Sequence, residues 1–273
     1  MRKVCVLGSF DDLKSRDVRF LHEAARLGEV HVLLLSDAIV ERLEGHPPKF
    51  FQEERRYFVE AIRFVRHLSM VGRAVEPDAL PHEHAVGCIK WVVREPEDSP
   101  GRRAFCEANG LDYSVVQDSH LAGFPEPPVE AIGDSTGRKR VLVTGCYDWL
   151  HTGHVRFFEE VAELGDVYAI VGHDRNIEFL KGRGHPMYSE DERRYMVSSI
   201  RHVKRALITS GYGWLDAEPE MELVRPDIYV VNEDGDRPEK REFCETHGIE
   251  YRVLKRRPRE GLPARQSTDL RGF

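Results

Sequence analysis

The sequence predicts an α/β protein made of two Rossmann-like domains in tandem, each built on a parallel sheet. Two observations lead to this fold class. Short apolar runs rich in β-branched residues alternate with segments of helical periodicity, a pattern typical of parallel βαβ units with right-handed crossovers. The succession of motifs in the first half also recurs in the second. With 273 residues, of which 41% are hydrophobic, the chain can bury two such cores.

The repeat is visible as pairs of motifs at a nearly constant separation. Residues 4–13 (VCVLGSFDDL) resemble residues 141–150 (VLVTGCYDWL), 137 positions later. The tetrapeptide Glu-Arg-Arg-Tyr occurs at 54–57 and again at 192–195, 138 positions later. Because the separation hardly changes along both halves, we interpret the chain as a tandem duplication.

A segment rich in proline, glycine and polar residues separates the two copies at 123–137, and such a composition predicts a linker. We therefore predict a first domain at 1–122, a linker at 123–138 and a second domain at 139–273. In the second domain the periodicity predicts strands at 141–144, 167–172, 206–209 and 228–231 and helices at 154–164, 189–203 and 238–247. The helix near 189 begins with Ser189-Glu-Asp-Glu192, a capping-box sequence.

Composition excludes several classes of protein. The formal net charge of −7 gives no overall basic field, so no nucleic-acid partner is expected. Five cysteines without metal-like spacing indicate reduced thiols rather than a disulfide framework. The first apolar run is too short for a signal peptide, and no stretch approaches the roughly 20 apolar residues of a membrane span. We expect a soluble cytoplasmic protein.

The second half carries two histidines in a turn between a strand and a helix. Gly145 follows the apolar run 141–143, and His151 and His154 stand where the helical pattern begins. Free N–H groups at a helix start favour an anion such as phosphate, and Gly153 would let the backbone approach it. A plain polar helix start and a metal site are the alternatives for His-x-x-His. Because no cysteine or carboxylate completes an obvious zinc set, no metal ligands are predicted.

Residues 145–154 (GCYDWLHTGH) resemble the signature of the cytidylyltransferase-like nucleotidyltransferases, which is His-x-Gly-His after a Gly-x-Phe/Tyr-Asp strand end. This family has domains of the HUP type. It includes glycerol-3-phosphate and phosphoethanolamine cytidylyltransferases, the adenylyltransferase that activates heptose phosphate, and archaeal-type FAD synthetases. The resemblance extends over the second half: Lys181-Gly-Arg183 resembles the mobile phosphate-binding loop, Arg193 the arginine that opens the next helix, and 266–270 (QSTDL) the late Ser-Thr-Thr segment.

The resemblance implies transfer of a nucleoside monophosphate from a nucleoside triphosphate to a phosphate-bearing acceptor, with release of pyrophosphate. An acceptor oxygen attacks the α-phosphorus, and fixed donors stabilise the charge that builds up. The implied catalytic residues are His151, His154, Lys181 and Arg193. The implied nucleotide-binding residues are Gly145, Cys146, Tyr147, Gly153, Asn232, Ser267 and Thr268. Mg²⁺ would arrive on the triphosphate, because it keeps waters and needs few protein ligands.

Other interpretations stay open for some of these residues. Lys181 is also consistent with a solvated loop lysine. Arg193 has a counterpart, Arg55, in the first half, which favours a structural role, and Asp148 is matched by Asp11. The first half has Lys14-Ser-Arg-Asp17 in place of His-Thr-Gly-His. It is therefore interpreted as an inactive copy that serves as a built-in dimer partner, or as a regulatory anion site at Lys14 and Arg16.

The favoured function is transfer of CMP from CTP to a small phosphoalcohol, such as glycerol 3-phosphate or phosphoethanolamine. The runner-up is an adenylyltransferase that uses ATP on a sugar phosphate or FMN. A third hypothesis, from another class, is a non-catalytic nucleotide-binding regulatory protein, suggested by the degenerate first half. The expected partners are the triphosphate and the phosphorylated acceptor, with an internal pseudo-dimer and a possible homodimer.

Overall fold

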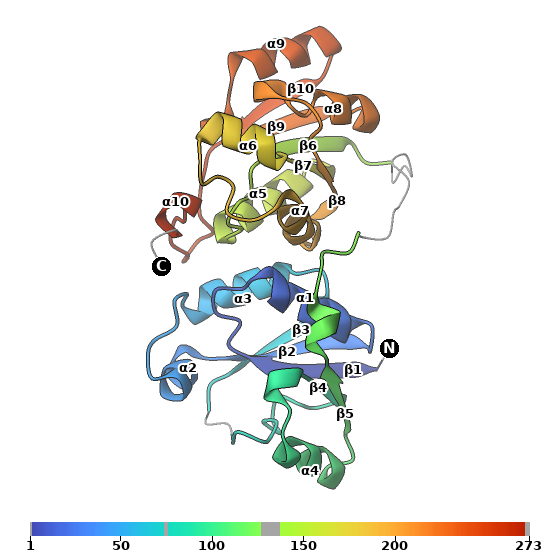
Figure 1. The fold of residues 1–273 in the computed structure, drawn as a ribbon, viewed down its shortest axis with the longest axis vertical. Coiled ribbons are helices and arrows are strands. Elements are labelled where there is room, and N and C mark those ends of the chain that lie inside the picture. Colours follow the sequence, from blue (N-terminus) through green and yellow to red (C-terminus); the bar gives the residue numbers. More distant parts are fainter. Residues whose placement is uncertain (1, 74–75, 127–136, 271–273) are drawn as a thin grey trace. The chain divides into compact units, whose positions relative to one another are not determined.

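The chain, described by a computed structural model, forms two compact units, Met1–Gly123 and Phe124–Phe273. The structure describes residues 2–73, 76–126 and 137–270, with the backbone alone at 268–269. Each unit contains a five-stranded parallel sheet with helices packed against it (Figure 1). Most of the predicted linker, residues 127–136, lies outside the described residues.

The first unit begins with β1 (Lys3–Gly8), α1 (Ser15–Ala25) and β2 (Glu29–Leu35). The elements that follow are α2 (Asp37–Glu44), α3 (Gln52–Ala61), β3 (Val65–Val71), β4 (Cys88–Arg94), a 3-10 helix (Glu95–Glu97), α4 (Pro100–Ala108), β5 (Asp112–Val116) and a second 3-10 helix (Asp118–Leu121). The strands lie in the order β3-β2-β1-β4-β5, and each neighbouring pair is parallel.

The second unit repeats this arrangement. Its elements are β6 (Arg140–Gly145), α5 (Thr152–Ala162), β7 (Asp166–Val171), α6 (Asp174–Lys181), α7 (Glu190–Ser198), β8 (Val203–Ile208), a 3-10 helix (Gly213–Leu215), α8 (Glu218–Val224), β9 (Ile228–Asn232), a 3-10 helix (Glu233–Gly235), α9 (Pro238–His247), β10 (Glu250–Leu254) and α10 (Ser267–Leu270). The strand order is β10-β9-β6-β7-β8. When each strand is matched with its counterpart in the repeat, this is the strand order of the first unit. The predicted α/β fold class with two parallel sheets is therefore confirmed.

The central strand β6 marks the point where the strand order of the second unit reverses. Strands β7 and β8 lie on one side of it, whereas β9 and β10 lie on the other. In open parallel sheets, ligands bind at such a point, beyond the carboxyl ends of the strands. The turn with the two histidines begins at this end of β6.

Packing holds both sides of the histidine turn in place. Val141, Leu142 and Val143 of β6 have no exposed surface, and Val155 and Phe158 of α5 are buried just as fully. Burial of such a side chain contributes about 1.5–3 kcal/mol. The turn therefore joins a strand and a helix that are both packed in the core, which fixes the positions of its two ends.

One predicted helix is shorter than expected, and some elements were missed. The helix predicted over 189–203 ends at Ser198, because Ser198 and Ser199 both donate their hydroxyls to the carbonyl oxygen of Tyr195 at 2.8 Å. This bonding competes with the helical ladder. Val203, which continues the helical spacing, instead opens β8 and pairs with Val167. Helices α6 and α8 and strand β10 were not predicted.

The cysteine prediction was wrong for one pair. Cys5 and Cys88 form a disulfide within the sheet of the first unit, whereas Cys106, Cys146 and Cys244 are free. The pairing was invisible in the sequence because 83 positions separate the two residues and their strands meet only in the fold. The prediction of a cytoplasmic location rested partly on reduced thiols and stays a prediction. Among the residues that the structure describes, no helix is long and apolar enough to span a membrane.

Candidate active site

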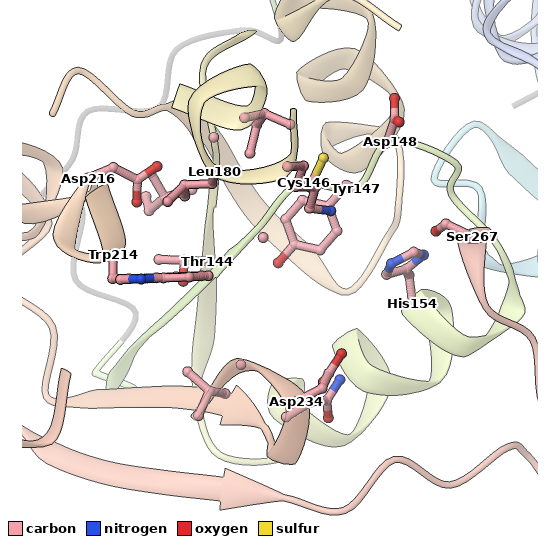
Figure 2. A pocket seen from close by; sticks show the side chains of 18 of the residues that line it. Thr144, Cys146, Tyr147, Asp148, His154, Leu180, Trp214, Asp216, Asp234 and Ser267 are labelled. Carbon is pink, nitrogen blue, oxygen red and sulfur yellow. The ribbon is translucent and has the colours of Figure 1, made fainter. Parts of the chain in front are cut away.

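A pocket of about 370 Å³ opens in the second unit at the carboxyl ends of β6 and β9. Seven of the residues predicted for the site line it: Gly145, Cys146, Tyr147, His154, Lys181, Asn232 and Ser267. Figure 2 shows His154 and Ser267 on one side and Leu180, Trp214 and Asp216 on the opposite side. The pocket thus has a polar side at the start of α5 and a side with aromatic and aliphatic surface.

The two histidines close a capping box at the start of α5. His151 is the N-cap, and its Nδ1 accepts a hydrogen bond from the backbone N–H of Gly153 at 3.1 Å. The backbone N–H of His151 in turn donates to Nδ1 of His154 at 3.3 Å. A ring nitrogen that accepts a hydrogen bond carries no proton, so each neutral ring holds its proton on Nε2. The capping box therefore leaves both Nε2–H groups as donors.

Burial keeps both imidazoles neutral. Burial is the main cause that lowers the pKa of His151 to about 3, with smaller contributions from Arg256 and Arg265. The pKa of His154 is also well below its usual value, through burial first and then the neighbouring His151. Within the described part of the chain, Nε2 of His151 is buried without a hydrogen-bond partner. An unpaired buried donor is costly, and an anion that accepted from it would remove that cost.

Two glycines have roles other than the one predicted for Gly153. A Cβ on Gly153 would lie 2.8 Å from Cε1 of His151, so this glycine makes room for the histidine ring rather than for a ligand. A Cβ on Gly145 would lie 2.7 Å from the ring of Tyr147, a residue with a positive φ of 53°. The glycine lets the tyrosine fold back over the strand end. Its ring then packs edge-on against His154 at 5.5 Å.

Lys181 and two further basic residues belong to the lining of the pocket. Lys181 is the last residue of α6 and is exposed, and Gly182 caps the helix with a φ of 86°. His185 and Arg256 also line the pocket. Arg256 is paired with Asp234 at 3.1 Å, whereas Lys181 projects from a helix end. Lys181 is thus placed to follow a triphosphate as a flexible point charge.

Arg193 lies outside the lining of the pocket, although the resemblance implied a catalytic role for it. Its side chain is 1% exposed. The guanidinium donates to the carbonyl oxygens of Tyr188, Cys146 and Gly172 at 3.0, 2.6 and 2.7 Å. It also pairs with Asp174 at 2.8 Å. Arg193 therefore ties together the chain segments that border the pocket, and four of its five N–H donors are used in doing so.

Asp148 is likewise a structural residue, as its counterpart Asp11 suggested. Its carboxylate is buried and accepts from the backbone N–H groups of Met187 and Tyr188 at 2.6 and 3.1 Å. It fixes the segment between Lys181 and α7 against the strand end. This anchors one border of the pocket.

The last short helix, α10, begins beside the histidine turn. Ser267 lines the pocket and donates its hydroxyl to the carbonyl oxygen of Trp149 at 3.2 Å. The carbonyl oxygen of Arg265 faces Gly153. Thr268 follows in α10, and its side chain lies outside the described residues.

Sequence reasoning missed two ionisable side chains on the wall of the pocket, buried Lys240 and half-buried Asp216. Lys240 of α9 is 7% exposed and donates to Thr144 and to the carbonyl oxygen of Gly235, each at 3.3 Å. Asp216 accepts from the amide of Asn176 at 2.8 Å. Burial is the main cause that lowers the pKa of Lys240 and raises that of Asp216. No pattern in the sequence marks Lys240, because this lysine stands in a charged stretch that indicates a solvated helix face.

The pocket lies at the point where the strand order reverses, with a helix capped by histidines at its edge and the basic residues Lys181 and Arg256 in its lining. These features define a nucleotide-binding α/β domain that acts on phosphates. Residues 142–264 match the family described as Cytidylyltransferase-like. The chain belongs to this family and is a nucleotidyltransferase, which confirms the class indicated by the histidine signature.

Known relatives give a finer comparison. The FAD synthase of Aciduliprofundum boonei is 40% identical over 119 residues, which are 42% of this chain and 76% of that protein. The FAD synthase of Ferroglobus placidus is 32% identical over 125 residues, 45% of this chain and 78% of the relative. The bifunctional protein HldE of Aliarcobacter butzleri is 34% identical over 122 residues, 43% of this chain but 24% of that longer protein.

Among solved structures, the lipopolysaccharide core biosynthesis protein of Thermoplasma volcanium is similar. The similarity covers 45% of this chain and 98% of that chain, with 24% identity and a TM-score of 0.37.

Proposed function

We propose that the second unit transfers AMP from ATP to a phosphate monoester, with FMN as the acceptor, and releases pyrophosphate. The observation that carries the proposal is the Nε2–H donor of His154, which the capping box of α5 holds at the pocket, whereas His151 supports the box from outside the pocket lining. The choice of nucleotide rests on the relatives named FAD synthase, three quarters of whose length this chain covers. They support the runner-up over the favoured prediction of cytidylyl transfer to a phosphoalcohol.

The reaction follows from where the donors lie. An oxygen of the acceptor phosphate attacks the α-phosphorus of ATP, the bond to the bridging oxygen breaks, and pyrophosphate leaves. Negative charge on the phosphoryl oxygens increases on the way, and donors already in place need no reorganisation to stabilise it. Nε2–H of His154 is such a donor. Lys181 approaches from the end of α6 and would follow the leaving pyrophosphate.

The residues of this pocket fit a Mg²⁺ ion that is bound mainly by the triphosphate. The lining contains three carboxylates: Asp148, Asp216 and Asp234. Asp148 and Asp216 accept from N–H donors, and Asp234 pairs with Arg256. Mg²⁺ is commonly held by substrate phosphates and waters with few protein ligands. When bound, the ion would neutralise charge on the leaving phosphates.

The apolar side of the pocket favours a flavin over a small phosphoalcohol. Trp214 is 44% exposed there, and Leu180 and Ile177 lie in the same lining. Arg237 lies over the indole ring at 4.4 Å and restrains it. A planar ring system gains from burial against such a surface, whereas a glycerol or ethanolamine group would leave it uncovered.

Pyrophosphate release with ATP or CTP, each combined with FMN, a sugar phosphate and glycerol 3-phosphate, tests the proposal. We expect turnover with ATP and FMN, and FAD as the product by chromatography. Trp214→Ala should raise the KM for FMN more than the KM for ATP. A preference for CTP would contradict the nucleotide assignment. Nucleotide binding without turnover on any acceptor would instead favour a regulatory protein.

The first unit is proposed to be non-catalytic and to act as an internal partner of the second. It has Lys14-Ser-Arg-Asp17 where the second unit has the two histidines. Its ion pairs also argue against a regulatory anion at Lys14 and Arg16, because Lys14 pairs with Asp12 at 2.9 Å and Arg16 with Asp118 at 2.5 Å.

A further inference from the structure

A row of cysteine and histidine side chains crosses the sheet of the first unit. Cys5 of β1 lies opposite His31 of β2, and His31 lies opposite His67 of β3. On the other side of β1, Cys88 begins β4 opposite Lys3, two positions from Cys5 and therefore on the same face. Four adjacent strands thus place Cys88, Cys5, His31 and His67 side by side.

Three of these residues form a compact buried group. The sulfur atoms of Cys5 and Cys88 and a ring nitrogen of His31 all lie within 4.8 Å of one another. The exposed fractions of Cys5, Cys88 and His31 are 0%, 7% and 5%. Leu33, Trp91 and other apolar residues of the core surround the two cysteines. Once the disulfide is opened, the three ligand atoms are close enough to share a single ion, and the apolar surroundings would keep water from it.

His31 is held in the form that a metal ligand requires. Its Nε2 contacts the hydroxyl of Ser69 at 2.8 Å, which fixes the ring. Its Nδ1 is buried and has no hydrogen-bond partner within the described residues. A metal ligand with one nitrogen fixed by an outer partner is the usual arrangement of histidine sites.

The second unit provides an internal control for this row. The residues at the equivalent strand positions are Leu142, Tyr168 and Arg205, which lie opposite one another in the same register. None of them resembles a soft-metal ligand. Since both units have the same strand order, the fold does not require cysteine or histidine at these positions.

We propose that, once the disulfide is reduced, Cys5, Cys88 and His31 bind a zinc ion, with His67 as the candidate for the fourth ligand. A dithiol supplies two electrons and two protons, which convert the disulfide to two thiols while the dithiol becomes a disulfide. Binding of Zn²⁺ then releases the two thiol protons, because the thiolate is the ligand. The ring of His67 lies 5.9 Å from that of His31 and its side chain is 47% exposed, so it can turn toward the group.

Zinc prefers four ligands in a tetrahedron and accepts sulfur and nitrogen together. The two cysteine sulfurs, the nitrogen of His31 and a fourth ligand from His67 would meet this preference. The sequence does not display the site, since the ligands come from four separate strands and no two stand at the short spacing of a zinc finger. The first unit would then exist in two forms, closed by a disulfide or by a metal ion.

The test uses the full chain, reduced with a phosphine and freed of metal under argon, and titrated with Co²⁺ and then Zn²⁺. We expect one equivalent of Co²⁺ per chain, with the near-ultraviolet band of thiolate-to-cobalt charge transfer, and displacement of this band by Zn²⁺. Cys5→Ala and Cys88→Ala should each remove the band. His31→Asn should weaken Zn²⁺ binding by about 100-fold, since loss of even an outer partner costs 10–100-fold.

Controls separate this site from the other thiols and from misfolding. A triple variant, Cys106→Ala, Cys146→Ala and Cys244→Ala, retains both ligand cysteines and should bind Co²⁺ as the wild type does. In the wild type, Zn²⁺ should slow alkylation of Cys5 and Cys88, measured by mass spectrometry, without slowing that of Cys146. Absence of Co²⁺ binding by the reduced wild type, or binding that the triple variant loses, would overturn the proposal.

Discussion

The two units share their structural supports but differ in the chemistry at one helix start. Arg55 of the first unit repeats the contacts of Arg193, since it donates to the carbonyl oxygens of Phe50 and Ser9 and pairs with Asp37 at 2.7 Å. Asp11 repeats Asp148 by accepting from the backbone N–H groups of Lys49 and Phe50 at 2.6 and 2.9 Å. What both copies retain therefore serves the fold.

The helix cap is also retained, although its residue types are not. In the first unit the N–H of Lys14 donates to the carboxylate of Asp17 at 2.7 Å, as the N–H of His151 donates to His154. Asp17 thus keeps the cap but puts a negative charge where His154 offers Nε2–H, and it is engaged by Arg94 at 2.7 Å. The pocket at this place is about 120 Å³, against about 370 Å³ in the second unit. The two units therefore share the cap geometry, and only the second has histidines in it.

If Arg193 and Arg55 have the same structural role, their removal should have the same result. Arg193→Ala and Arg55→Ala are each expected to destabilise the unit that contains them by about 3–5 kcal/mol, because the carbonyl oxygens around the buried guanidinium lose their donors, at about 1–3 kcal/mol for each. Urea unfolding of the full chain measures this effect. An Arg193→Ala protein with unchanged stability but lost activity would restore the predicted role on the triphosphate.

His154→Asp converts the helix start of the second unit into that of the first. The cap should survive, so the unfolding midpoint should hardly change. Transfer activity should fall by about 10²–10³-fold, the cost of removing one donor to developing charge. The matched variant, Asp17→His, should leave pyrophosphate release unchanged. Activity of His154→Asp within a factor of about three of the wild type would remove the histidine from the mechanism.

Lys181 has no lysine counterpart in the first unit, where Leu43 stands 138 positions earlier. Lys181→Ala is expected to lower kcat/KM about tenfold, or about 1.4 kcal/mol, without an effect on stability. Lys139→Ala is the control, since that lysine belongs to an exposed pair with Glu250 in the same unit. Equal kcat/KM values for the two variants would show that Lys181 is only a solvated loop residue.

The pH dependence of stability should sharpen the same contrast. Because the folded pKa of His151 is about 3, the unfolded chain binds more protons than the folded chain below about pH 6.5. Stability should therefore fall as the pH falls, and His151 should account for about 1.4 kcal/mol between about pH 7.5 and 5.5. His151→Gln should flatten this part of the profile of urea unfolding midpoints. A slope that does not change would mean that the pKa of His151 is the same in the folded and the unfolded chain.

Sequence patterns predicted the parallel α/β fold and the histidine turn because both depend on local periodicity and on a contiguous motif. They did not predict where Arg193 points, since its acceptors come from three other segments that only the fold brings together. The same limit applies to Lys240, whose charged neighbours along α9 hide its burial, and to the pair Cys5 and Cys88 on separate strands. The internal repeat did predict one of these features, because the counterpart Arg55 in the first half indicated a structural role for Arg193.

The chain is expected to have one site for a nucleoside triphosphate, formed by the histidines of the second unit. Calorimetric titration of the full chain with an ATP analogue that carries a methylene group between the α- and β-phosphates tests this claim directly. We predict one equivalent per chain, binding that His154→Asp abolishes, and no effect of Asp17→His. Two equivalents per chain, or one equivalent that His154→Asp leaves intact, would contradict the claim.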